Sequence, residues 1–343
     1  MVDTQVLSGQ FRRFAERECK DSSILYEHLA SQIADDPTLL ELAAHSKPGQ
    51  PAPNLLLGAV HYLLLQGTDH ELALYYPSIV TEPKDTSGAF KWFKLFCEQY
   101  AVEITHLLRT KLVQTNEVRR CAYLYPSFCH IHGLTQKPLS LIEIGTSAGV
   151  QLLWDKYSYS YQPKPDLEYG QEHAALIIRS EIKGDKQPLF HKTSPPVAAR
   201  IGIDLHVNNL DQPDDYLWLK SLIWPEHKER IAYFEAAADY LAKYKVELME
   251  GDGVALLPEI ISKISNDSTV CIFHTHAANQ FPSETKIKLL EYIQELGKVR
   301  EVFHLYNNLW DRDLHLDYYV NGIENKLTLA ETDGHGRWFK WKL

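Results

Sequence analysis

Short β-rich runs alternate with helical patterns from Leu139 to the end of the chain. The strand-like runs are LSLIEIG, VAARIGIDLHV, KVELMEGD, STVCIFHTH and VREVFHLYNN, and the helical ones are GVQLLWDKY, ERIAYFEAAADYLAKY, VALLPEIISKI and KIKLLEYIQELG. This alternation predicts an α/β fold with a mostly parallel, doubly wound sheet. Two further runs, LHLDYYVNG and LTLAETDGHGRWFKWKL, are joined through Asn321-Gly322, which predicts an antiparallel hairpin.

The first part of the chain has helical spacing instead. FRRFAEREC, SSILYEHLASQIA and PTLLELAAH carry apolar residues at helical intervals. PNLLLGAVHYLLLQG is apolar almost all round, which predicts a buried central helix that ends at Gly67. We therefore expect a helical N-terminal domain over residues 1–135 and a Rossmann-like domain over 136–343. HAALIIRSEI predicts a strand inside a turn-rich stretch, so the second domain should carry a β insertion around 157–198.

Composition narrows the classes of partner. The chain has 343 residues and a formal net charge of -10, and no basic stripe that would displace counterions from a nucleic acid. The start, MVDTQVLSGQFRRF, lacks the apolar core of a signal peptide, and no apolar run approaches the roughly 20 residues that span a bilayer. The five cysteines form no CxxC pair, so buried reduced thiols are expected. The sequence predicts a cytoplasmic protein without a nucleic-acid or membrane partner, and leaves its oligomeric state open.

The turn after the first predicted strand is the first place to look for a ligand. Doubly wound sheets bind ligands beyond the carboxyl ends of their strands, where glycines let the backbone come close. The nicotinamide pattern G-x-G-x-x-G starts well at Gly145 but meets Ser147 and Val150 where it needs glycine. The phosphate-binding P-loop needs Lys and Ser or Thr after its last glycine, and Gly149 is followed by Val-Gln.

The same turn resembles the first motif of class I S-adenosylmethionine-dependent methyltransferases, acidic-x-Gly-x-Gly-x-Gly. Glu143, Gly145 and Gly149 match it, and Ser147 stands in for the middle glycine. The resemblance implies S-adenosylmethionine as the cofactor. Glu143 would bind its methionine ammonium, and the residues of the turn, including Thr146, would contact the cofactor. It also implies a seven-stranded methyltransferase-type sheet that ends in an antiparallel hairpin.

Acidic residues follow two later strands. Asp204 ends RIGIDLHV, where the methyltransferase family places the acidic residue that holds the ribose hydroxyls. Asp252 follows VELMEG, where the family often has an acidic residue near the adenine amino group; the alternative is a turn-forming aspartate. The insertion puts Asp204 much further than the usual 20 or so residues from the glycines, so Asp166 or Glu168 is an alternative ribose ligand.

Two histidines end the fourth predicted strand, where the family sets substrate-facing residues. Histidine can act as a general base near neutral pH, and residues two apart in a strand share one face. His274 and His276 could therefore enter one pocket as catalytic residues, with His274 as the base. The alternative is a pair of structural or surface histidines. Their spacing supplies too few ligands for a metal, so no metal site is expected.

Two polar segments have both an ordinary and a functional interpretation. In QTNEVRRC, Thr115 or Asn116 can cap a helix, with Glu117 in its first turn. Alternatively, Asn116, Glu117 and Arg120 form a lid over the cofactor or substrate, which makes Glu117 a third catalytic candidate. In the closing DGHGRW, His335, Arg337 and Trp338 are further candidate site residues, and a hairpin turn is the simpler interpretation.

The whole chain resembles a bacterial family catalogued as domain of unknown function 2332. The resemblance rests on PNLLLGAVHYLLL, VQTNEVRRCAYLYP, LIEIGTSAGVQLLWDKYSY, IGIDLHVNNLD and TDGHGRWFKW. It implies a methyltransferase-like domain with a helical N-terminal extension and no particular substrate. Methyl transfer from S-adenosylmethionine to a small-molecule acceptor is the favoured expectation. Two alternatives stay open: a non-catalytic binder of an adenosine-containing ligand, and a nicotinamide-dependent or hydrolytic enzyme that uses the same crevice.

Overall fold

The structure, a computed structural model, describes residues 4–343 and divides into two compact units. The helical unit comprises the residues up to Thr115 together with Asp211–Ala232, and the sheet unit comprises Asn116–Leu210 and Tyr233–Leu343. This division differs from the expected boundary after residue 135. Helix α7 (Cys121–Thr135) belongs to the sheet unit because its side chains pack on it: the Phe128 ring stacks on Trp154 with centroids 4.6 Å apart.

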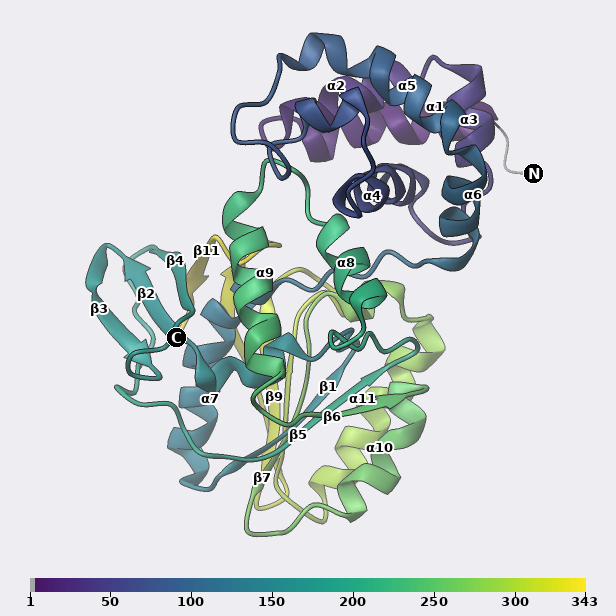
Figure 1. The fold of residues 1–343 in the computed structure, drawn as a ribbon. Coiled ribbons are helices and arrows are strands. Elements are labelled where there is room, and N and C mark those ends of the chain that lie inside the picture. Colours follow the sequence, from purple (N-terminus) through teal and green to yellow (C-terminus); the bar gives the residue numbers. More distant parts are fainter. Residues whose placement is uncertain (1–3) are drawn as a thin grey trace. The chain divides into compact units, whose positions relative to one another are not determined.

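The helical unit is built around α4 (Ala52–Leu65), which is buried along nearly its whole length. Gly67 follows it with φ +90°, a left-handed conformation that ends the helix. The prediction of a buried central helix is confirmed. The other α-helices of this unit are α1 (Thr4–Phe14), α2 (Ile24–Ile33), α3 (Pro37–Ala43), α5 (Ala89–Gln99), α6 (Ala101–Thr110) and α8 (Pro213–Ser221) (Figure 1). Within residues 4–343, no helix is both long and apolar enough to cross a membrane.

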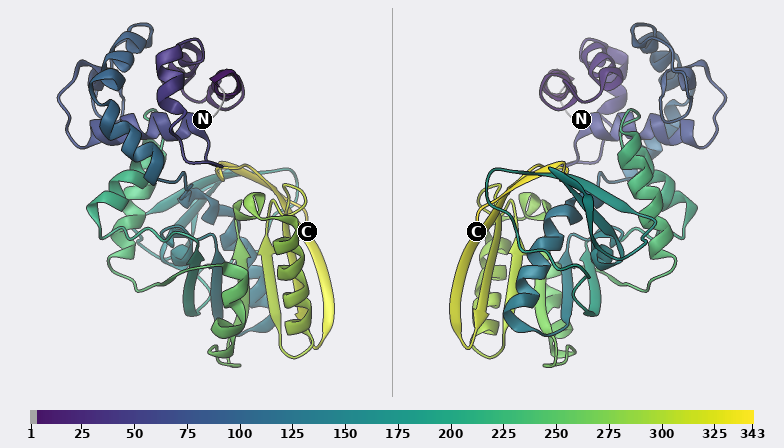
Figure 2. Two further views of the ribbon diagram at one scale, coloured as in Figure 1. Left: turned by 90° about the vertical axis from the view of Figure 1, so that its right-hand side faces the viewer. Right: turned by 90° about the vertical axis from the view of Figure 1, so that its left-hand side faces the viewer.

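The sheet unit contains one eleven-stranded sheet with the order β3-β2-β4-β11-β10-β9-β8-β7-β1-β5-β6. The expected number of seven strands was wrong. The inserted strands β2, β3 and β4 enlarge the sheet because the last strand, β11, pairs with β10 on one side and with β4 on the other (Figure 2). The strands are β1 (Leu139–Ile144), β2 (Ser158–Gln162), β3 (Lys164–Gly170), β4 (Ile177–Lys183), β5 (Val197–Asp204), β6 (Glu247–Glu250), β7 (Thr269–His274), β8 (Val302–Tyr306), β9 (Leu314–Val320), β10 (Ile323–Thr332) and β11 (Trp338–Trp341).

Five parallel strands, in the order β6-β5-β1-β7-β8, form the doubly wound part of this sheet. Numbered along the chain they run 3-2-1-4-5, so the strand order reverses between β1 and β7, which is where such sheets bind ligands. Helices α10 (Gly253–Ser262) and α11 (Ser283–Gly297) cover one face (Figure 1). Helix α7 and the part of α9 (Lys228–Leu241) from Tyr233 onward cover the other.

Two local predictions had different outcomes. The hairpin through Asn321-Gly322 is confirmed: β9 and β10 pair antiparallel, and both turn residues have positive φ, +54° and +73°, as a tight two-residue turn requires. The expected α-helix GVQLLWDKY is instead a seven-residue 3₁₀ helix, Val150–Lys156, with a kink at Leu153. Strand β2 begins only two residues later, which leaves little room for a regular helix.

Candidate functional site

In the turn after β1, glycines occupy the positions where other side chains of the protein pack closely against the backbone. Gly145 has φ +79°, and a Cβ there would lie 2.4 Å from the Cβ of Ala277, which begins a short 3₁₀ helix after β7. Gly149 has φ +82°, and its Cβ would lie 3.0 Å from Leu248 on β6. Both glycines are therefore explained by backbone conformation and packing, while the approach of a cofactor to them stays a prediction.

Ser147 adopts a left-handed conformation, φ +54°, at the position where the resembled motif has glycine. Its backbone N–H donates to Oδ2 of Asp204 over 2.8 Å, and its Oγ accepts a hydrogen bond from Nδ2 of Asn208 over 3.2 Å. The backbone N–H of His206 donates to the other carboxylate oxygen of Asp204 over 3.2 Å. Asp204 thus holds the turn in place. Contact of Asp204 with ribose hydroxyls stays a prediction.

Glu143 is a buried carboxyl group near the end of β1, two residues before Gly145. It is 3% exposed, and Oγ1 of Thr146 donates a hydrogen bond to its Oε2 over 2.6 Å. Gly202 on β5 makes room for Thr146, since a Cβ there would lie 2.5 Å from Oγ1. The pKa of Glu143 is raised to about 8, chiefly by burial; the hydrogen bond from Thr146 lowers it, the nearby charge of Asp204 raises it, and the charge of Arg120 lowers it. A cationic group placed beside Glu143 would relieve this cost of burying a negative charge.

Acidic residues collect at the carboxyl ends of the three neighbouring strands β1, β5 and β6. They are Glu143, Asp204, Glu250 and Asp252. Asp252 is exposed and caps α10, with its Oδ1 accepting the backbone N–H groups of the second and third helical residues over 2.8 and 3.0 Å. Its capping role is therefore present, and contact with an adenine stays a prediction.

The alternative ribose ligands Asp166 and Glu168 are not near this edge. Both lie on β3, and both are exposed. Strand β3 stands at one end of the sheet order, whereas β5 and β6 stand at the other. This alternative was wrong because the insertion extends the far side of the sheet instead of crossing the crevice.

The two candidate catalytic histidines have different surroundings. Strand β7 ends at His274, which is fully buried, with its Nε2 3.1 Å from Nε2 of His304. His276 lies beyond the strand with φ +62°. The expectation that both rings share one strand face was wrong, because the alternation of side chains stops where the strand ends.

His276 faces the polar side of the crevice. Its backbone N–H donates to Oδ1 of Asn307, the residue that follows β8, over 2.9 Å. Gly334 is close to its ring, since a Cβ there would lie 3.6 Å from Cε1 of His276. Burial, followed by the charge of Arg120, lowers the pKa of His276 to about 3. The imidazole is therefore neutral at pH 7, and within the described residues its Nε2 has no hydrogen-bond partner.

The two polar segments with open interpretations meet beside His276. Glu117 is 2% exposed, and its Oε2 lies 3.2 Å from Nδ1 of His335, which is 218 residues away in the chain. Nε of Arg120 donates to the carbonyl of Gly334 over 3.0 Å. Glu117 also caps the short 3₁₀ helix Val118–Arg120, so the capping residue is Glu117 itself and not Thr115 or Asn116. These hydrogen bonds join the segment QTNEVRR to the loop DGHGRW.

A family model described as "Uncharacterized protein conserved in bacteria (DUF2332)" matches residues 8–341. The chain belongs to this family. No curated protein matches the chain. The match covers both units and every segment of the crevice, so the DUF2332 architecture includes the helical unit as well as the sheet.

Sequence reasoning missed three polar residues of the DUF2332 crevice. Thr275 donates through its hydroxyl to Oε1 of Gln151 over 3.0 Å and lies 3.4 Å from Nη1 of Arg120. The buried amide of Asn307 contacts the hydroxyl of Tyr123 over 3.5 Å. Thr275 and Asn307 could have been predicted, because each directly follows a parallel strand and ligands bind at the carboxyl ends of such strands. Gln151 lies in the predicted helix, where nothing distinguishes it from a surface residue.

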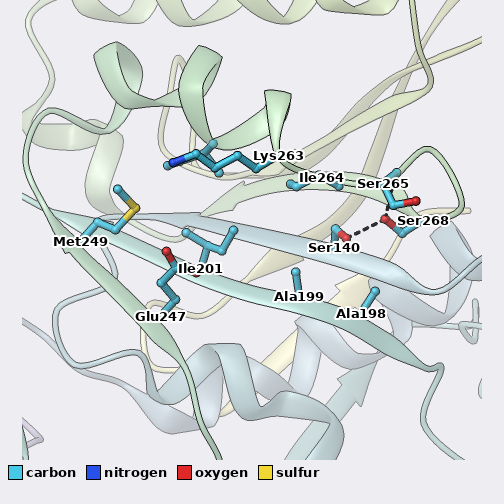
Figure 3. Close-up of a pocket in the computed structure, with 11 residues that line it drawn as sticks. Ser140, Ala198, Ala199, Ile201, Glu247, Met249, Lys263, Ile264, Ser265 and Ser268 are labelled. Atoms are coloured by element: carbon cyan, nitrogen blue, oxygen red, sulfur yellow. Dashed lines mark hydrogen bonds between the residues drawn. The ribbon is translucent and has the colours of Figure 1, made fainter.

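A hollow of about 290 Å³ lies at the opposite, amino-terminal edge of β1, β5 and β6 (Figure 3). Small side chains at Ala198 and Ala199 leave space beneath Ile264, in the segment that follows α10. Its polar groups are largely satisfied, since the hydroxyls of Ser140 and Ser268 hydrogen-bond over 2.8 Å. This hollow is separate from the DUF2332 crevice at the carboxyl ends of the same strands. Within residues 4–343, no three His, Cys, Asp or Glu side chains are grouped to hold a metal ion.

Proposed function

We propose that the crevice at the carboxyl ends of β1, β5 and β6 binds S-adenosylmethionine, and that the protein transfers its methyl group to a small-molecule acceptor. The observation that carries the proposal is the burial of Glu143 next to a second carboxylate, Asp204. The hydrogen-bond partner of Glu143 is the uncharged hydroxyl of Thr146. S-adenosylmethionine carries an ammonium and a sulfonium, so it would add positive charge beside Glu143 to the charge that Arg120 already supplies.

The same charges disfavour a nicotinamide dinucleotide. Its pyrophosphate is anionic and binds best at the N-terminus of a regular helix. Here the turn leads into a kinked seven-residue 3₁₀ helix, Val150–Lys156, and the neighbouring strand ends carry four acidic side chains. An anionic cofactor would be repelled, whereas a cationic one would be attracted.

The residues of the crevice have separable roles in this proposal. Glu143 would hold the ammonium and Asp204 the ribose hydroxyls, with the Ser147 turn kept in shape by Asp204. S-adenosylmethionine supplies the reactive methyl group when bound. We assign His276, whose Nε2 is unpartnered among the described residues, the role of accepting a hydrogen bond from the acceptor; its low pKa makes it a weak base until a bound acceptor changes its surroundings. It replaces His274 in this role, because the ring of His274 contacts His304 on the face that carries α11.

Calorimetric titration tests the cofactor. S-adenosylmethionine and S-adenosylhomocysteine should both bind, and Glu143→Gln should weaken both at least about tenfold, because a hydrogen bond to a charged group is worth about 1.5–3 kcal/mol. Glu301→Gln, which removes a carboxylate paired with Lys137, is the matched control and should leave both affinities unchanged. Asp204 is a poor choice for this test, since its loss would also release the Ser147 turn.

Three outcomes would contradict the proposal: no binding of either compound, tighter binding of NAD than of S-adenosylhomocysteine, or equal affinity in Glu143→Gln. Turnover is tested separately by following methyl transfer to a panel of small amines, alcohols and carboxylates. His276→Ala should keep the affinity for S-adenosylhomocysteine but lose most of the transfer rate. Binding without transfer to any acceptor would favour the non-catalytic binder.

A further inference from the structure

A second cavity, of about 520 Å³, lies between α11 and the strands β8, β9 and β10. Its volume falls within the range of roughly 300–1,000 Å³ that is usual for small-molecule sites. It opens on the sheet face that carries α11, whereas the side chains of Glu143 and Thr275 contact groups on the α7 side. The proposed cofactor crevice makes no use of it.

Strand register places polar side chains together under α11. The antiparallel pairing sets His304 opposite Asp317, Tyr306 opposite His315, and Asp317 opposite Lys326. Directly opposed residues point to the same face of a sheet, and all five side chains line the cavity. A sheet face beneath a helix is ordinarily apolar. The polar stripe is therefore unexpected in a purely structural contact.

Aromatic rings form one wall of this cavity. The rings of His304 and Tyr306 stack with centroids 4.3 Å apart, and those of Tyr306 and His315 stack at 5.3 Å. Trp310 also lines the cavity and is 62% exposed, and the ammonium of Lys286 already lies over its ring, 5.2 Å from the centroid. Faces of aromatic rings carry negative potential and attract cations.

Acidic groups outnumber basic ones around the cavity. Asp317 is 9% exposed, and its Oδ2 accepts a hydrogen bond from the uncharged hydroxyl of Tyr306 over 2.9 Å. Glu291 and Glu324 are the other acidic residues of the lining, and Lys326 is its one lysine or arginine within the described residues. Lys326 pairs with Glu324 over 3.1 Å. Lys326 also lies opposite Asp317, so this one cation is shared between two carboxylates and the lining keeps more acidic than basic groups.

A buried histidine nitrogen at the wall is also without a partner. His304 is fully buried and lines the cavity. Its Nε2 lies 3.1 Å from Nε2 of His274, and within the described residues its Nδ1 makes no hydrogen bond. An unsatisfied buried polar atom is costly, so it points to a ligand atom that would complete it.

We propose that this cavity binds an organic ammonium ion, with Asp317 as its counter-ion and the Tyr306–His315 wall against its cationic head. Burial raises the pKa of Asp317, and a bound cation would hold that carboxylate in its charged form. The unpartnered Nδ1 of His304 would meet a polar group of the ligand. This site is independent of the S-adenosylmethionine crevice.

Choline and its uncharged carbon isostere, 3,3-dimethylbutan-1-ol, test the proposal in calorimetric titrations of the full chain. Choline should bind at least about tenfold more tightly than the isostere, since the two differ in charge and hardly in shape. Asp317→Asn keeps an acceptor for Tyr306 but removes the charge, and should weaken choline binding at least about tenfold. Glu295→Gln, on the exposed side of α11, is the matched control and should bind choline as the wild type does.

A second variant covers the case in which Asp317→Asn does not fold. Leu290→Phe on α11 fills part of the cavity and should abolish choline binding while far-ultraviolet circular dichroism stays unchanged. Glu143→Gln should leave choline binding intact, which separates this site from the crevice. Equal binding of the two probes, no binding of choline, or full affinity in either Asp317→Asn or Leu290→Phe would overturn the proposal.

Discussion

Ser147 donates its backbone N–H to the carboxylate of Asp204 over 2.8 Å, from a left-handed conformation that the resembled motif assigns to glycine. That conformation costs a residue with a Cβ roughly 1–2 kcal/mol. A charge-assisted hydrogen bond of this kind offsets the cost. The acidic residue at the end of β5 therefore stabilises the turn at the end of β1, whatever ligand the crevice holds.

Ser147→Gly should change the free energy of unfolding by less than about 1 kcal/mol. Glycine removes the conformational cost, but the variant loses the side-chain hydrogen bond from Asn208, which is worth about 1 kcal/mol. Ser147→Val should destabilise by at least about 2 kcal/mol, because β-branched residues are true outliers at positive φ. Urea denaturation of the two variants measures the difference. Equal midpoints would mean that the left-handed conformation at Ser147 is wrong.

Gly145→Ala should destabilise the protein more than Gly322→Ala. Both glycines have positive φ, +79° and +73°, so both substitutions carry the same conformational cost of about 1 kcal/mol. A Cβ at Gly322 meets nothing within 4 Å, whereas one at Gly145 lies 2.4 Å from the Cβ of Ala277. We expect an extra loss of about 1–3 kcal/mol from this overlap. Urea denaturation should also show that Ala277→Gly restores part of the stability of Gly145→Ala; failure of that rescue would contradict the packing argument.

The sequence predicts the doubly wound strands and the closing hairpin because their signals are local: apolar runs, glycine turns and the Asn321-Gly322 connection. It does not predict β2 and β3, which lie in a turn-rich stretch and are stabilised by pairing with distant strands. For the same reason it could not join Glu117 to His335, which are 218 residues apart. The prediction that His274 and His276 share one face was wrong for a different reason. It extended the alternation of a strand two residues beyond His274, where β7 ends.

The pH dependence of stability should differ between the wild type and Glu143→Gln. The pKa of Glu143 is about 8 in the folded protein and near its ordinary value of 4.5 in the unfolded chain. Between these values the folded state binds one more proton than the unfolded state, so the stability of the wild type falls as pH rises from 4.5 to 8. From pH 4.5 to 8 the stability of Glu143→Gln relative to the wild type should therefore rise, by a few kcal/mol in order of magnitude. Urea denaturation at pH 5 and pH 8 measures this, and a constant difference between the two proteins would contradict the raised pKa.

Binding of S-adenosylhomocysteine should release a proton near pH 7. The free protein holds Glu143 largely protonated, since its pKa is about 8. An ammonium beside the carboxyl would lower that pKa and ionise it. Titrations in phosphate and in Tris buffers, whose ionisation enthalpies differ, give the number of protons released: up to one per ligand for the wild type and none for Glu143→Gln. The affinity of the wild type should accordingly rise from pH 6 to pH 8. Proton release of the same size in both proteins would place the titrating group elsewhere and remove Glu143 as the ammonium ligand.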